Sequence, residues 1–153
     1  VHRDIKPGNV MVCERGGNSE VVKLLDFGLV HEPDADEGLT REGFVVGTPA
    51  YMSPEQASSR STDRRSDVYS LGALAYFLVT GRPPFVADSV LEVMIKQRQE
   101  TPESPRSFAP DLPEAFETIV LRALAASPDD RFRDTRAFDE ALGAIEVTRS
   151  RPA

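Results

Sequence analysis

The sequence predicts a mainly α-helical domain that carries one small β-hairpin near its start. Two short apolar, β-branched runs, 10–13 and 21–25, flank the turn-forming stretch Arg-Gly-Gly-Asn-Ser at 15–19, as expected of a hairpin. Residues 67–80 are apolar on almost every side, which indicates a buried helix. Further stretches with helical spacing follow, and prolines separate them.

Four helices are expected in the second half of the chain. They are predicted at residues 67–80, 89–99, 114–125 and 135–147. The first is expected to be capped by Ser66 and to stop at Gly81. Residues 29–46 are acidic and too long for a simple connection, so a surface loop is predicted there. We expect one domain over residues 1–148 and the start of a linker at 149–153.

The composition limits the classes of function. The 153 residues, 40% of them hydrophobic, suffice for a single core. A net charge of −7 argues against a nucleic-acid partner, which would favour a basic face. Cys13 is the only cysteine, so an internal disulfide is excluded. No stretch reaches the roughly 20 apolar residues of a membrane span. We expect a cytoplasmic location, at the membrane face if an anchor lies outside these residues.

The first residues bring together the side chains that phosphoryl transfer requires. Asp4 can accept a hydroxyl proton, and Lys6 can hold the transferring phosphate. Asn9 and Asp26 offer oxygen ligands for Mg²⁺. They lie at the two ends of the predicted hairpin, where antiparallel pairing would bring them together. The alternatives are a loop aspartate, a solvated lysine and two turn-capping residues.

Several triplets occur in a recognisable order. These are His-Arg-Asp at 2–4, an asparagine at position 9, Asp-Phe-Gly at 26–28 and Ser-Pro-Glu at 53–55. The combination resembles the catalytic half of eukaryotic-like protein kinases, and the match covers essentially the whole chain. The lysine two residues after Asp4 and the Gly-Thr pair at 47–48 are similar to serine/threonine kinases. The stretch 47–57 looks most like bacterial members.

The resemblance implies an enzyme that transfers the γ-phosphate of ATP to serine and threonine hydroxyls of proteins. It implies ATP as co-substrate, Mg²⁺ or Mn²⁺ as the metal, and protein substrates as partners. A second copy of the kinase is a further expected partner, in trans-autophosphorylation. By the same resemblance, Asp4 and Lys6 are catalytic, and Asn9 and Asp26 bind the metal.

Four more residues receive binding roles from the resemblance. Arg3 would bind a phosphate on the activation loop, and Thr40 is the best-placed acceptor of that phosphate. Thr48 would belong to the substrate platform and bond to Asp4 and Lys6. Met11 would form the floor of the adenine pocket, with a plain core position as the alternative.

The remaining motif residues receive structural roles. His2 and Phe27 are expected to pack, and Gly28 to let the chain turn beside the metal. Asp67 would fix the catalytic loop through backbone N–H groups, or else cap its helix. Glu55 and Arg131 would form a buried ion pair by resemblance. The neighbouring residues Arg64 and Arg65 are expected to be solvated.

Three kinase parts have no counterpart in these 153 residues: a glycine-rich loop, a Val-Ala-Ile-Lys-type lysine, and a partner glutamate on a helix. We therefore expect the C-terminal lobe without the N-terminal lobe, beginning at the catalytic loop and inactive alone. The helix that would precede this loop is missing too, so apolar surface on residues 67–80 should be exposed.

Two alternatives remain open. The first is a non-catalytic, pseudokinase-like lobe that binds a peptide or partner through the groove below residues 47–55 and the helix from Ser89. The second is a small phosphotransferase acting on sugars or antibiotics. The intact set of polar residues argues against the first, and the 47–55 platform argues against the second.

Overall fold

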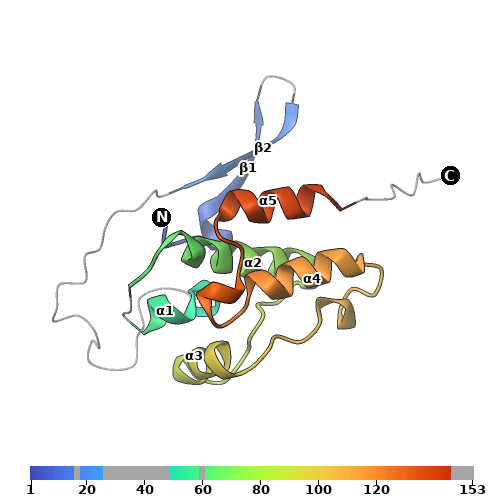
Figure 1. Cartoon of the computed structure of the whole chain (residues 1–153). Coiled ribbons are helices and arrows are strands. Elements are labelled where there is room, and N and C mark those ends of the chain that lie inside the picture. Colours follow the sequence, from blue (N-terminus) through green and yellow to red (C-terminus); the bar gives the residue numbers. More distant parts are fainter. Residues whose placement is uncertain (16–17, 26–48, 59–60, 146–153) are drawn as a thin grey trace.

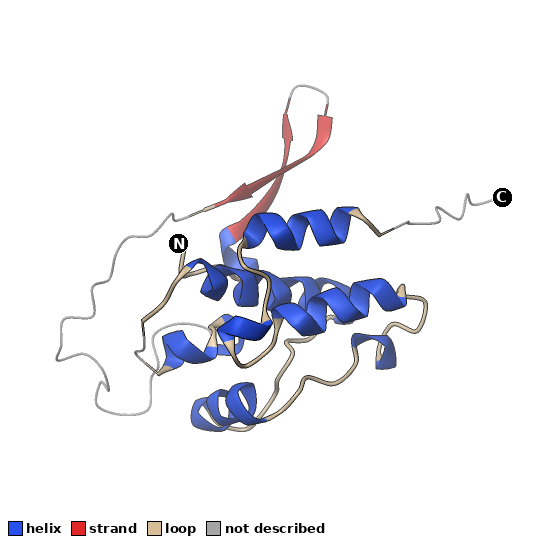
Figure 2. Cartoon of the chain, in the orientation of Figure 1, coloured by secondary structure: helices blue, strands red, loops and turns tan. Residues whose placement is uncertain are grey.

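The computed structural model describes residues 1–15, 18–25, 49–58 and 61–145. Helices dominate this part of the chain. The described residues also contain two strands, which pair as one antiparallel hairpin (Figure 2). The prediction of a mainly helical domain with a small hairpin is confirmed. Figure 1 shows the hairpin projecting from the helical body, with α3 on the opposite side. The expected linker at 149–153 lies outside the described residues.

The hairpin consists of β1 (Val10–Arg15) and β2 (Asn18–Leu24). The register pairs Val10 with Leu24 and Val12 with Val22, with an irregularity near the turn. The backbone N–H of Leu25 donates to the Asn9 carbonyl at 2.8 Å, which extends the pairing past both strand ends. The residues at the open end of the hairpin therefore lie side by side, as the sequence predicts.

The central helix is α2 (Arg64–Thr80), which begins three residues before its predicted start. Asp63 caps it, because the Asp63 carboxylate accepts a hydrogen bond from the Arg65 N–H at 2.8 Å. Ser66 lies inside the helix, so the prediction that it is the cap is wrong. The helix ends as predicted at Gly81, whose φ of 73° is left-handed and suits glycine.

Two apolar clusters surround α2 and form the core. One comprises Tyr51, Tyr69, Ala73, Tyr76, Val120 and Leu124, and the other Val68, Ala123, Phe132 and Phe138. Gly72 lets α4 approach closely, since a Cβ there would lie 2.8 Å from the Ala123 Cβ. Leu78 is the exception on this helix, because 72% of its surface is exposed.

The short helix α1 (Pro54–Ala57) was not predicted, whereas the three other helices lie near their predicted positions. These three are α3 (Val90–Gln99), α4 (Glu114–Ala123) and α5 (Thr135–Gly143). The last one stops four residues before its predicted end, at a glycine with low helix propensity. Short 3-10 turns occupy Pro7–Asn9, Pro49–Tyr51, Pro105–Ser107 and Pro128–Asp130. Within the described ranges, no helix combines the length and apolarity that crossing a membrane requires.

Candidate active site

Asp67 anchors the beginning of the chain to α2. Its carboxylate accepts the backbone N–H of His2 at 2.8 and 3.0 Å and the backbone N–H of Arg3 at 3.0 Å. Asp67 is buried, and hydrogen bonds to an ionised carboxylate are the stronger kind. Asp63 caps the helix, so Asp67 does not have this role. Asp67 instead holds the loop through the backbone N–H groups of His2 and Arg3.

Arg3 adopts an unusual backbone conformation directly before Asp4. Its φ of 67° lies in the left-handed region, which costs a residue with a Cβ about 1–3 kcal/mol. Such a conformation persists where neighbouring contacts determine it. Here Asp67 accepts the Arg3 N–H, and the Arg3 carbonyl accepts a hydrogen bond from the Gln56 amide at 2.9 Å.

Three of the predicted site residues converge. Lys6 Nζ lies 2.9 Å from Asp4 Oδ1, and Asn9 Nδ2 lies 2.8 Å from Asp4 Oδ2. The Asn9 amide nitrogen also donates to the Asp4 carbonyl at 2.8 Å. We call these three side chains the Asp4 cluster. The Asp4 side chain is 46% exposed, so its carboxylate is held by two neighbours yet still reachable from solvent.

Asn9 is placed to offer its amide oxygen to a metal ion. Both of its hydrogen bonds use the amide nitrogen, which leaves Oδ1 available as a ligand. Asp26 lies outside the described residues, but its neighbour Leu25 is hydrogen-bonded to the Asn9 backbone. An amide oxygen together with a carboxylate suits Mg²⁺, which prefers oxygen ligands and retains several waters. The amide oxygen of Asn9 therefore fits one position in such a ligand set.

The other predicted site residues divide into two groups. Phe27, Gly28, Thr40 and Thr48 lie outside the described residues, as Asp26 does. Met11 lies on β1 and is 48% exposed, so it is not a core residue of the described chain. Arg3 has an exposed side chain, and His2 is buried beneath the loop.

The chain was compared with known protein families and curated proteins. The protein kinase domain family matches residues 1–142. The chain belongs to the protein kinase family. Serine/threonine-protein kinase Pkn1 of Myxococcus xanthus is 44% identical over 142 residues, which cover 93% of this chain and 20% of that protein. Serine/threonine-protein kinase PksC of Streptomyces coelicolor is 48% identical over 144 residues, covering 93% of this chain and 25% of that protein.

A third relative, serine/threonine-protein kinase PknB of Mycolicibacterium smegmatis, is 40% identical over 134 residues, covering 87% of this chain and 21% of that protein. These relatives are bacterial, as the stretch 47–57 predicts. The chain spans between a fifth and just over a quarter of the length of the curated relatives it matches.

Glu55 and Arg131 form a buried, bidentate ion pair. Arg131 donates to the two Glu55 carboxylate oxygens at 2.7 and 2.9 Å, and Ser66 adds a third hydrogen bond at 2.7 Å. Burial alone would raise the pKa of the Glu55 carboxyl, but hydrogen bonds from Arg131 and Ser66 outweigh it, so this pKa lies below its ordinary value. The pair expected in a kinase is present.

Arg131 also forms hydrogen bonds with two backbone segments. Its guanidinium donates to the carbonyls of Ala125, Ala126 and Arg65, at 2.7, 3.0 and 3.1 Å. Its side chain is fully buried, and the guanidinium lies 4.9 Å from the centre of the Tyr69 ring. Every face of this cation therefore has a partner, which is the condition for a buried charge to be tolerated.

Two glutamines that were not predicted as site residues contact residues 49–57. We call residues 49–57 the platform segment, because they include the described part of the platform predicted at 47–55. Gln97 on α3 is buried and donates to the Pro49 carbonyl at 2.8 Å. Gln56 forms a capping box with Ser53 at the start of α1 and reaches the catalytic loop at Arg3. The Ser-Pro-Glu-Gln order at 53–56 is a capping-box signature that the sequence displays.

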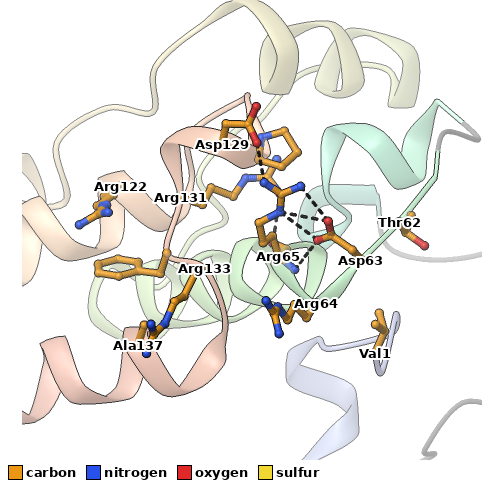
Figure 3. Close-up of a pocket in the computed structure, with 12 residues that line it drawn as sticks. Val1, Thr62, Asp63, Arg64, Arg65, Arg122, Asp129, Arg131, Arg133 and Ala137 are labelled. Atoms are coloured by element: carbon orange, nitrogen blue, oxygen red, sulfur yellow. Dashed lines mark hydrogen bonds and ion pairs between the residues drawn. The ribbon is translucent and has the colours of Figure 1, made fainter.

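A cavity of about 1010 Å³ lies at the start of α2 (Figure 3), and its lining does not include the residues of the Asp4 cluster. Its lining includes five arginines and two aspartates. Figure 3 shows the dashed contacts converging on Arg65, which lies 2.8 Å from Asp63 and 2.6 Å from Asp129. Arg64 is exposed as predicted, and the partly exposed Arg65 forms two surface ion pairs that the sequence did not predict. Both acidic side chains of this lining pair with Arg65, so the lining carries an excess of positive charge.

Proposed function

We propose that residues 1–148 are the C-terminal lobe of a bacterial serine/threonine protein kinase that transfers the ATP γ-phosphate to protein hydroxyls. The observation that carries the proposal is the Asp4 cluster, in which an ammonium group and an amide each lie within 3 Å of one carboxylate. The family and its serine/threonine-kinase relatives support it. The whole protein's activity is part of the proposal.

Each member of the cluster has a defined task in this reaction. The substrate hydroxyl gives its proton to the Asp4 carboxylate as the oxygen attacks the γ-phosphorus, and ADP leaves. Lys6 places positive charge beside the moving phosphoryl group. Asn9 and Asp26 would hold Mg²⁺, which neutralises charge on the phosphate oxygens. Exposure of half of the Asp4 side chain gives the hydroxyl access to it.

The nucleotide site requires parts that these 153 residues do not contain. A glycine-rich loop and a strand lysine normally hold the ATP phosphates. We therefore propose that the isolated chain is inactive and that an N-terminal lobe in the full-length protein completes the site. Exposure of Leu78 on α2 and of Met11 on β1 supports a covering partner for these surfaces.

Transfer of radiolabelled phosphate from ATP to a generic protein substrate tests this function. We expect the full-length protein to label serine and threonine, as read by phosphoamino-acid analysis, and the 153-residue chain to label nothing. Labelling of a sugar or antibiotic in preference to protein would favour the small-molecule phosphotransferase. Transfer by the isolated chain would overturn the proposal that an N-terminal lobe is needed.

Asp67 and Asp63 provide a matched pair of substitutions. In the full-length enzyme, Asp67→Ala is expected to lower kcat about tenfold to a hundredfold, because charge-assisted hydrogen bonds worth about 1.5–3 kcal/mol then no longer fix the loop. Asp63→Ala removes a helix cap and an exposed ion pair with Arg65, and it is expected to cost about 0.5–2 kcal/mol of stability, with kcat per folded molecule retained. Equal kcat losses for the two variants would contradict the anchoring role.

Thr40 is the proposed phosphorylation site of the activation loop, with Arg3 as the phosphate ligand. The exposed guanidinium of Arg3 has no carboxylate within 4 Å in the described part of the chain, which leaves it available. A phosphate at Thr40 would add about −1.5 to −2 charges. We propose that a second copy of the kinase phosphorylates Thr40. We therefore expect Thr40→Ala to lower the activity of the full-length enzyme. Thr118→Ala is the control and is expected to keep wild-type activity. Wild-type kinetics in Thr40→Ala would reject the proposed role of Thr40.

A second candidate function is a non-catalytic lobe that binds a partner protein. The observation favouring it is apolar exposure along α3, where Leu91 is 67% and Ile95 44% exposed. The intact Asp4 cluster counts against it, because a pure binding module has no need of that arrangement. A full-length protein that binds partners but transfers no phosphate would favour this function.

A further inference from the structure

The peptide bond that joins Arg3 to Asp4 is held at both of its polar atoms by side chains. Its N–H, which belongs to Asp4, donates to His2 Nδ1 at 3.3 Å. Its carbonyl, which belongs to Arg3, accepts from Gln56 Nε2 at 2.9 Å. The Asp4 side chain leaves the backbone next to this peptide, so its direction depends on both contacts.

The backbone conformation of Arg3 depends on its hydrogen bond with Gln56. With φ at 67°, Arg3 occupies a region that L residues rarely adopt without support from their surroundings. Asp67 supports the N–H side of this residue and Gln56 supports its carbonyl side. Loss of either support lets Arg3 relax, which would turn the peptide that carries Asp4.

The other end of the Gln56 side chain is fixed by Ser53. Gln56 Oε1 accepts the Ser53 N–H at 3.1 Å and the Ser53 hydroxyl at 3.0 Å. Since Oε1 faces two donors, Nε2 must point the other way, toward the Arg3 carbonyl. Ser53 is fully buried and caps α1 shortly after the 3-10 turn at Pro49–Tyr51. One amide group therefore joins the platform segment to the catalytic loop.

We propose that Gln56 is a positioning residue that couples the platform segment to Asp4. The inference rests on the proposed kinase function and deepens it. A protein substrate bound on the platform segment shifts Ser53, and the Gln56 amide carries that shift to the Arg3 carbonyl and so to the Asp4 carboxylate. Occupation of the peptide site thereby sets the alignment of the proton acceptor.

Gln56→Glu in the full-length enzyme tests the hydrogen bond that Gln56 Nε2 donates to the Arg3 carbonyl. The introduced carboxylate has the same length and still accepts from Ser53, but it cannot donate to Arg3. We expect kcat for peptide phosphorylation to fall about threefold to tenfold, the worth of one hydrogen bond, with the KM for ATP unchanged. Gln99→Glu makes the same chemical change at the exposed end of α3 and is expected to leave kcat unchanged.

The pH profile separates positioning from a general structural defect. Protonation of the introduced carboxyl restores a donor, so the ratio of Gln56→Glu kcat to wild-type kcat should rise as the pH is lowered toward the ordinary glutamate pKa of about 4.3. Gln56→Met keeps the length but restores nothing, so its ratio should stay constant. In Gln56→Met we also expect faster hydrogen exchange at the Asp4 amide, measured on the folded protein.

The outcomes distinguish the coupling from the kinase function itself. A wild-type protein that transfers no phosphate refutes the proposed function, while hydrogen exchange at Asp4 still reports whether Gln56 holds the loop. If the wild type is active, wild-type kcat in Gln56→Glu together with unchanged exchange in Gln56→Met overturns the coupling and leaves the function standing.

Discussion

Replacement of Asp4 by asparagine should lower kcat of the full-length enzyme by about 10²- to 10⁴-fold, the usual contribution of a positioned proton acceptor. Asparagine has the same shape but cannot take the hydroxyl proton. One of the two acceptor oxygens becomes an NH₂ group, so the amide can keep the hydrogen bond from either Lys6 or Asn9, which still holds it near its wild-type position. The effect is therefore expected in kcat, with the KM for ATP nearly unchanged.

The control for this prediction is Asp139→Asn, which makes the same change at an exposed position on α5. It is expected to leave both activity and melting temperature unchanged. Thermal unfolding of Asp4→Asn should also match the wild type, since the substituted side chain is half exposed. An Asp4→Asn enzyme that retains wild-type kcat would show that another group accepts the proton.

Replacement of Arg131 by alanine should destabilise the protein by about 3–5 kcal/mol, measured by urea unfolding. The substitution leaves the buried Glu55 carboxylate without its cation and removes hydrogen bonds to three backbone carbonyls. The lowered pKa of Glu55 would then rise, because burial would no longer be opposed by Arg131.

The matched control is Arg136→Ala, which breaks an exposed ion pair with Glu140 on α5. Exposed pairs of this kind contribute about 0.3–0.5 kcal/mol, so the two arginines should differ about tenfold in their effect. The double substitution Glu55→Leu with Arg131→Met should destabilise less than Arg131→Ala, since it strands no charge. Equal unfolding midpoints for Arg131→Ala and Arg136→Ala would contradict the role of the pair.

Local signals in the sequence predicted much of the fold. The hairpin follows from a Gly-Gly turn between two β-branched runs, and its pairing places Asn9 beside the residue before Asp26. The end of α2 follows from Gly81. The cap at its start was predicted wrongly as Ser66, because a serine and the nearby Asp63 can both cap a helix. In the structure the Ser66 hydroxyl donates to the carboxylate of Glu55, 11 residues earlier in the chain, and Asp63 caps the helix instead.

The contacts that position the site were harder to predict, because they join residues distant in sequence. Asp67 reaches His2 across 65 residues, and Gln56 reaches Arg3 across 53. The capping box from Ser53 to Gln56 is visible in the sequence, but it does not reveal that the free end of the same amide binds the catalytic loop. The left-handed conformation of Arg3 has no local sequence signal, since no glycine or asparagine occupies that position.

The central claim is that Asn9 and Asp26 hold one metal ion beside the Asp4 carboxylate. Anomalous diffraction from crystals of the full-length enzyme with Mn²⁺ and a non-hydrolysable ATP analogue tests it most directly. We predict a manganese peak at about 2.0–2.4 Å from both the Asn9 amide oxygen and an Asp26 carboxylate oxygen, on the side of the loop that Asp4 faces. A manganese ion bound elsewhere, with Asp26 turned away from Asn9, would contradict the account.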